Sequence, residues 1–180
     1  IQSRLTDHTI AVSQILEKEG LVEIQLAISG VSSKCAHRWG LQHKLKRTVS
    51  QGEGNLGLRM RKQVLLAQRT RSRNKNGRST IIIGTDLPSL CHLDLIEAIN
   101  ALKKHEIVFG PSSDGGYWLI GLAGKLVNPV PSWPFFEIPW GTNHVLEQTL
   151  IRAKQAGVSH ELLNEHNDID QLEDLSPWQG

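Results

Sequence analysis

A short run of β-branched residues, STIIIGTD from Ser79 to Asp86, constrains the fold of this chain more than any other stretch. Three isoleucines follow one another in it, without the polar alternation that would leave one face of a strand in water. Wholly apolar strands of this kind are typical of parallel sheets that helices cover on both faces. The run therefore predicts a buried parallel strand that ends in an acid, Asp86.

Helical and extended patterns alternate along the rest of the chain, without an internal repeat or a break in composition. This order predicts a mostly parallel sheet between helices, in a single α/β domain. Apolar residues recur with helical spacing, or alternate as in strands, in separate segments. The expected helices cover residues 6–20, 56–68, 92–105 and 142–157, and the other expected strands cover residues 21–29, 46–51, 106–110 and 158–164.

Composition limits the class of protein. With 180 residues, 39% of them hydrophobic, the chain is long enough to bury a core. No apolar run has the length of a membrane span, and no signal peptide is recognisable. Cys35 and Cys91 are isolated, which indicates neither a disulfide framework nor a zinc site. We therefore expect a cytoplasmic protein with reduced thiols and no membrane partner.

The net charge of +2 hides a basic first part and an acidic second part. Residues 1–80 hold 15 Lys or Arg against 5 Asp or Glu, and residues 81–180 hold 5 against 13. A basic half suits an anionic ligand, and an acidic half suits a metal ion or plain solvation. The run RTRSRNKNGR, residues 69–78, lacks interleaved aromatics, so it predicts a solvated loop and no nucleic-acid partner.

Asp86 has a favourable position for chemistry, because ligands of α/β sheets bind beyond the carboxyl ends of the strands. Its carboxylate suits Mg²⁺ or Mn²⁺, which prefer oxygen ligands and bridge to phosphates. It equally suits a cap of the turn or helix that follows, ahead of Pro88. Both interpretations stay open on the residues alone.

The stretch EIVFGPSSDGGYWLIGL interrupts two apolar runs with Asp114, Gly115, Gly116 and Tyr117. Asp-Gly between apolar residues is a strong hairpin signal. The same residues fit a backbone bend against which a ligand lies, held by the acid and the tyrosine. The aromatic loop that follows, with Trp140 near its end, fits either a lid that stacks on a ligand or packing onto the core.

The stretch SQGEGNLGLRM contains Gly52, Gly54 and Gly57 with the spacing of dinucleotide-binding loops. No strand ending in an acid follows about twenty residues later, which argues against a nicotinamide cofactor. A glycine turn that leads into a helix carrying Arg59 remains, and it fits an anion. Helix starts with surface arginines are also common, so this interpretation has a plain alternative.

The acidic stretch NDIDQLEDL near the end of the chain contains Asp168 and Asp170. It lacks the central glycine and the last glutamate of an EF-hand loop. Acids clustered in this way usually form a solvated face or a helix cap. They would complete a metal site with Asp86 if the tail folds back.

Four stretches, TIIIGTDLPSL, IVFGPSSDGGYWLIGL, IPWGTNHVLEQTL and DIDQLEDL, resemble a bacterial family of uncharacterised GT-A-like transferases. GEGNLGLRM resembles the same family's Gly-Leu-Gly-x-Arg-Met segment. The resemblance spans essentially all 180 residues. It implies a three-layer α/β/α GT-A fold, that of nucleotide-diphospho-sugar transferases, with a mostly parallel sheet.

The resemblance also implies a metal-dependent transferase that uses a nucleotide-sugar or a nucleoside triphosphate, for glycosyl or nucleotidyl transfer. Asp86 would bind Mg²⁺ or Mn²⁺, with Asp168 or Asp170 as a second ligand. For the DGGY segment, residues 114–117, the resemblance favours a ligand-facing bend over a plain hairpin. The roles that follow are catalytic for Asp114 and Tyr117, substrate-binding for Gly115, Gly116 and Trp140, and phosphate-binding for Gly54, Gly57 and Arg59.

The chain departs from the family at its start. Family members begin with a central strand and a basic glycine-containing loop, whereas this sequence starts inside the following helix, at IQSRL. We therefore expect a GT-A-like domain over residues 1–180 that is truncated at its N-terminus. Unpaired strand edges would favour a homodimer. The alternative to an enzyme is a non-catalytic remnant, which binds nucleotides weakly or serves as a protein-interaction module.

Overall fold

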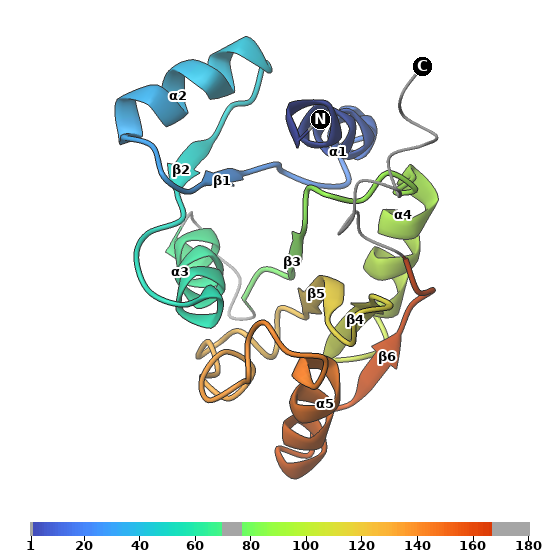
Figure 1. Cartoon of the computed structure of the whole chain (residues 1–180). Coiled ribbons are helices and arrows are strands. Elements are labelled where there is room, and N and C mark those ends of the chain that lie inside the picture. The colour runs from blue at the N-terminus through green and yellow to red at the C-terminus, as the bar shows by residue number, and fades with distance from the viewer. Residues whose placement is uncertain (1, 70–76, 167–180) are drawn as a thin grey trace.

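The computed structural model describes residues 2–69 and 77–166, and it shows a mixed α/β fold (Figure 1). The predicted alternation of helices and strands is confirmed over most of this length. A helix over residues 33–42 was not predicted. The elements are α1 (Gln2–Lys18), β1 (Leu26–Ile28), α2 (Ser33–Gln42), β2 (Thr48–Ser50), α3 (Leu56–Arg69), β3 (Thr80–Ile83), α4 (His92–Ala101), β4 (Ile107–Pro111), β5 (Tyr117–Leu122), α5 (Val145–Gln155) and β6 (His160–Leu162).

The strands form two sheets, which differ from the single mostly parallel sheet that the sequence predicts. β1 and β2 pair in parallel, and a four-stranded sheet has the order β3-β5-β4-β6. Within the larger sheet β4 and β6 are parallel, whereas β5 is antiparallel to both β3 and β4. The larger sheet is mixed because a short turn joins β4 to β5, and so short a connection permits only antiparallel pairing.

The prediction of a buried parallel strand at β3 is wrong. β3 pairs with β5 alone among the described strands, in antiparallel register, and all four of its residues are only half-buried. Its second edge borders a cavity instead of another described strand. Isoleucines that face a cavity and isoleucines that face a protein interior give the same sequence pattern.

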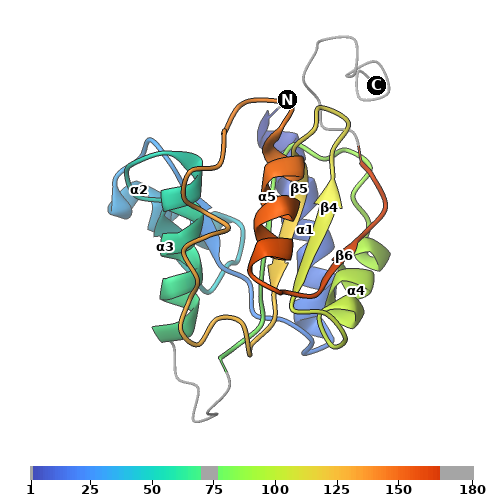
Figure 2. The same ribbon diagram turned by 90° about the horizontal axis from the view of Figure 1, so that it is seen from below.

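The core lies on both faces of β4 and β5. Along β4 the buried side chains alternate: Val108 packs with α1 and α4, and Ile107 and Phe109 pack with α3 and α5. Figure 2 shows the same arrangement, with α1 and α4 on one side of these strands and α3 and α5 on the other. The two inner strands therefore hold the site-bearing turns on a rigid base.

Within the described part of the chain, no helix combines the length and the apolar character that crossing a bilayer requires.

Candidate functional site

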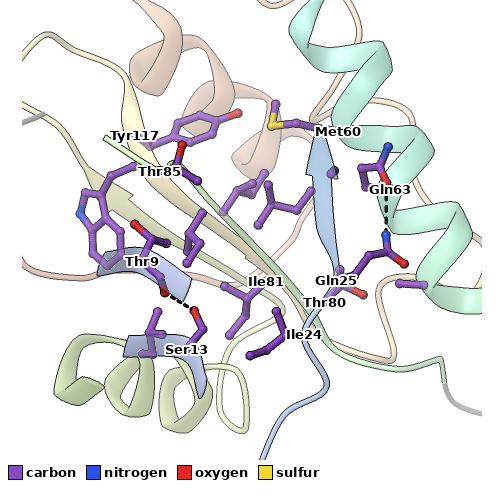
Figure 3. A pocket seen from close by; sticks show the side chains of 18 of the residues that line it. Thr9, Ser13, Ile24, Gln25, Met60, Gln63, Thr80, Ile81, Thr85 and Tyr117 are labelled. Carbon is purple, nitrogen blue, oxygen red and sulfur yellow. Dashed lines mark hydrogen bonds between the residues drawn. The ribbon is translucent and has the colours of Figure 1, made fainter. Parts of the chain in front are cut away.

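The candidate site is a cavity of about 1080 Å³ between the two sheets. Residues of β1, β3, α1 and α3 are among those that line it (Figure 3). In Figure 3 Thr9 and Ser13 come from α1, Gln63 from α3, and Thr85 from the segment after β3. The end next to Thr85 is where the loop carrying Asp86 begins.

Main-chain groups of both flanking strands point into this cavity. On β1 the Leu26 N–H donates to the Arg47 carbonyl (3.0 Å), and the Ile28 carbonyl accepts from the Gln51 N–H. Because main-chain groups alternate along a strand, those of Ala27 point to the edge of β1 that faces away from β2. On β3 the Gly84 N–H donates to the Trp118 carbonyl (3.0 Å). By the same alternation, the main-chain N–H and carbonyl groups of Ile81 and Ile83 point away from β5, towards the cavity. The Gln51 amide covers the Ala27 carbonyl at 3.2 Å.

Several buried polar side-chain atoms around the cavity have no hydrogen-bond partner within the described residues. Buried polar atoms are almost always paired in folded proteins, so such a group indicates a place for a polar ligand or water. These atoms are Thr9 Oγ1, Gln25 Oε1, Arg59 Nε, Tyr117 Oη and Trp140 Nε1.

Asp86 is exposed, directly beyond the cavity-lining Thr85. It does not cap α4, because Cys91 is the N-cap of that helix and the Asp94 carboxylate accepts from the Cys91 N–H (2.7 Å). A Cβ at Gly84 would lie 2.7 Å from Asp86 Oδ1. The carboxylate therefore folds back over the end of β3, and glycine there leaves room for it.

The DGGY segment is a tight turn between β4 and β5, and it also lines the cavity through Asp114, Gly116 and Tyr117. The two interpretations of this stretch are therefore compatible. Asp114 Oδ1 accepts from the Ser112 hydroxyl (2.6 Å) and from the Gly116 N–H (2.8 Å). Among the described residues Asp114 Oδ2 has no recorded hydrogen bond, so one oxygen of a firmly held carboxylate is available to a ligand.

Gly115 shapes the turn and is not part of the cavity wall. Its φ is +85°, in the region that favours glycine, and a Cβ there would collide with the carbonyl of Asn143. Gly115 therefore brings the turn against the start of the segment that leads into α5. The Gly115 carbonyl also accepts from the Leu146 N–H (3.0 Å).

Tyr117 contributes mainly its ring. The ring contacts Phe109 and Trp140, with centroid distances of 5.4 and 6.2 Å. Burial raises the pKa of the Tyr117 hydroxyl well above its usual range, and the Thr149 hydroxyl opposes this shift. The Thr149 hydroxyl itself donates to the Val145 carbonyl (2.7 Å). The hydroxyl is therefore a neutral donor at physiological pH.

The phosphate-binding residues that the sequence predicts are only partly brought together. Arg59 lines the cavity, and its Nη1 donates to Gln51 Oε1 (3.1 Å). Gly54 is exposed in the turn before α3, and Gly57 packs under the Phe135 carbonyl and the Trp140 ring. Gly57 therefore permits close packing of the aromatic loop, and Trp140 joins the cavity wall as a result.

Asp168 and Asp170 lie outside the described residues. The described chain ends just before them, at His166, whose ring Nδ1 lies 2.8 Å from the Ser89 hydroxyl of the Asp86 loop. The chain thus approaches Asp86 shortly before the predicted acids. The sequence analysis did not single out His166. Within residues 2–69 and 77–166, no three His, Cys, Asp or Glu side chains lie together as metal ligands would.

Comparisons with known proteins agree with this architecture. No curated protein matches the chain. A crystal structure of a protein from Desulfovibrio desulfuricans G20, named a "putative nucleotide-diphospho-sugar transferase", matches with a TM-score of 0.71. The two sequences are 22% identical, over 93% of this chain and 70% of the other. The model of a family described as "uncharacterized protein conserved in bacteria" (DUF2064) matches residues 12–142, so the chain belongs to this family.

Proposed function

We propose that this protein is a metal-dependent transferase that uses a nucleotide-activated donor, for glycosyl or nucleotidyl transfer. One observation carries the proposal: Asp114, whose carboxylate Ser112 and Gly116 hold, lines the cavity, and so does Thr85, the residue before the exposed Asp86. The overall similarity to the Desulfovibrio protein supports a GT-A fold for the chain that forms this cavity. Residues of β1 and of β3, which belong to different sheets, line the cavity together.

Asp86 is the metal ligand of this proposal, with Asp168 or Asp170 as its partner. Exposed carboxylate oxygens are the ligands that Mg²⁺ and Mn²⁺ prefer, so the residue types fit the ion. When bound, such an ion neutralises the diphosphate of the donor and holds it in place. Asp86 can turn towards such an ion because its carboxylate makes no recorded hydrogen bond among the described residues.

Arg59 supplies positive charge on the opposite wall of the cavity. It lies in the first turn of α3, and its hydrogen bond to Gln51, another residue of the cavity wall, holds the guanidinium at that wall. Its Nε is buried without a partner in the described chain. A guanidinium with free donors binds phosphate oxygens well, which fits the diphosphate of a nucleotide donor.

Asp114 holds the acceptor in this proposal. The free Oδ2 accepts a hydrogen bond, and then the proton, from an acceptor hydroxyl or phosphate, while Oδ1 stays bound to Ser112 and Gly116. Tyr117 and Trp140 form the apolar wall beside it. Transfer from a nucleotide donor depends on positioning and charge neutralisation, so no nucleophilic side chain is needed.

A second candidate function is a protein-interaction module, and the open strand edges favour it. The Ala27 N–H on one side and the main-chain groups of Ile81 and Ile83 on the other face the same cavity. Such edges bind extended peptides or a second copy of a chain by strand addition. This candidate predicts peptide binding or dimerisation that is independent of metal.

Isothermal titration separates the two candidates. The ligands are UDP-glucose, GTP and CTP, each with and without Mn²⁺, against the wild-type chain and Asp86→Asn. Glu97→Gln, an exposed acid of α4, is the matched control. The transferase predicts nucleotide binding that requires Mn²⁺, is lost in Asp86→Asn and is kept in Glu97→Gln. Absence of binding by all three nucleotides would contradict the transferase and favour the interaction module.

A further inference from the structure

His166 is the residue through which the described chain reaches both acidic segments of the candidate site. It follows β6, and its side chain is only 14% exposed. The ring stands edge-on to Trp118 of β5, with a centroid distance of 4.9 Å and an angle of 90°. The side chain is therefore fixed against a core element.

The main chain of His166 is tied to the Asp114 turn. Its N–H donates to the Pro111 carbonyl (3.1 Å), and it forms a parallel bridge with Ser112. Ser112 is 6% exposed, and its hydroxyl donates to Asp114 Oδ1 at 2.6 Å. The position of the Asp114 carboxylate thus depends on a serine whose backbone His166 holds.

The ring of His166 is tied to the Asp86 loop. Nδ1 lies 2.8 Å from the Ser89 hydroxyl, and Nε2 lies 3.2 Å from Asp94 Oδ1 at the start of α4. Nε2 makes no hydrogen bond among the described residues, so the contact with Asp94 is one of proximity to the carboxylate. The ring is therefore held on both sides, by the Ser89 hydroxyl at Nδ1 and by the Asp94 carboxylate near Nε2.

The geometry points to His166 as a positioning residue, which holds the Asp86 loop and the Asp114 turn in a fixed relation so that both acids serve one ligand. This role rests on the proposed transferase function. Leu87 and Leu90 anchor the same loop in the core, with exposures of 0% and 2%. Loss of the ring should therefore displace the polar face of the loop without unfolding it.

The test compares His166→Ala, His166→Asn and the control His160→Ala, which removes an exposed histidine from β6. An asparagine amide occupies roughly the place of Nδ1, so it keeps the Ser89 contact. We expect His166→Ala to weaken Mn²⁺-dependent nucleotide binding about tenfold, as loss of residues that orient metal ligands does. His166→Asn should recover part of this loss, and His160→Ala should bind as the wild type does.

Hydrogen exchange of residues 84–91 and 112–116 gives a readout that needs no ligand. Faster exchange in residues 84–91 for His166→Ala supports positioning even if the wild type binds no nucleotide and the proposed function fails. Residues 112–116 are the internal reference, because the main chain of His166, which alanine keeps, holds them. Unchanged exchange in residues 84–91, or wild-type affinity in His166→Ala, overturns it. Labelling of Ser89 by a fluorophosphonate that requires His166 also overturns it, because the pair would then act as nucleophile and base.

Discussion

The two sheets of the molecule differ in how they are held. In the larger sheet β4 and β5 pair on both edges, and residues such as Ile107 and Leu119 are fully buried. In the smaller sheet β1 and β2 have three residues each, all half-buried, and side-chain amides connect them to α3. Gln63 is the centre of these contacts, since its amide donates to the Ser50 and Gln51 carbonyls and accepts from Gln25.

This difference divides the candidate site into a firm half and a softer half. Asp86, Asp114 and His166 belong to the larger sheet and its connections, whereas Arg59 and Gln51 belong to the smaller sheet and α3. Regions with few buried apolar contacts open at lower free energy than the core does. We therefore expect the acids to keep their places while the basic wall of the cavity moves to close on a ligand.

The largest expected effect comes from the same substitution in each sheet. Ile107→Ala removes a fully buried side chain from β4, and we expect it to lower the free energy of unfolding by about 2–5 kcal/mol. Ile28→Ala removes a half-buried side chain from β1, where about 1 kcal/mol is typical. Urea denaturation of both variants measures the difference. Equal losses would show that the two sheets are held alike.

The second effect concerns the turn that carries Asp114. Gly115→Ala places a Cβ against the Asn143 carbonyl at a φ of +85°, and we expect a loss of about 3 kcal/mol from strain and overpacking together. Gly141→Ala is the matched control, because its φ is +81° and a Cβ there meets open space. It should lose only about 1–2 kcal/mol, the strain alone. Thermal melts that rank the two variants in the opposite order would contradict the role of Gly115 in docking the turn.

Local patterns were sufficient to predict most helices and the turn between β4 and β5. Periodicity acts within one element, so it located α1, α3, α4 and α5 with small errors at their ends. It missed α2, which has few apolar residues; the available signal was Ser32, whose hydroxyl caps the helix by accepting from the Cys35 N–H (3.3 Å). Pairing is a property of two distant segments, which is why the antiparallel setting of β3 was not predictable.

The candidate site shows the same limit. Sequence position marked Asp86 and Asp114 because each is a polar residue at the end of an apolar run. Nothing local marks His166, since its contact with Ser89 joins residues 77 apart in the chain. The role of Tyr117 depends on how deeply its hydroxyl is buried, which the sequence does not show. In the structure the hydroxyl is buried, and the ring contacts Trp140 in the cavity wall.

A smaller effect tests the amide contacts of the soft half. Gln63→Met keeps roughly the length of the side chain but leaves the Ser50 and Gln51 carbonyls without this donor. We expect a loss of about 1–2 kcal/mol, since the Gln63 side chain is buried. Hydrogen exchange should become faster in residues 48–51 and stay unchanged in residues 107–111. A rise in both segments would mean that the sheets open as one unit.

The smallest effect is a pH dependence confined to the firm half. The Ser159 backbone N–H (3.0 Å) donates to the Glu106 carboxylate and lowers its pKa, burial opposes this, and the Ser159 hydroxyl and Lys125 add to the lowering. Because the folded state has the lower pKa, the contact stabilises the fold above the ordinary pKa of glutamate. That stabilisation is lost as the pH falls through the lower value.

Glu106→Gln should therefore be less stable than the wild type at neutral pH, with the two urea midpoints converging as the solution becomes acidic. Glu97→Gln, on the exposed face of α4, controls for loss of charge alone. Since Glu106 joins the start of β4 to the residue before β6, the effect should appear in the exchange of residues 160–162 and not in residues 26–28. A difference between the two urea midpoints that stays constant at every pH would mean that Glu106 stabilises the fold by packing and not by its charge.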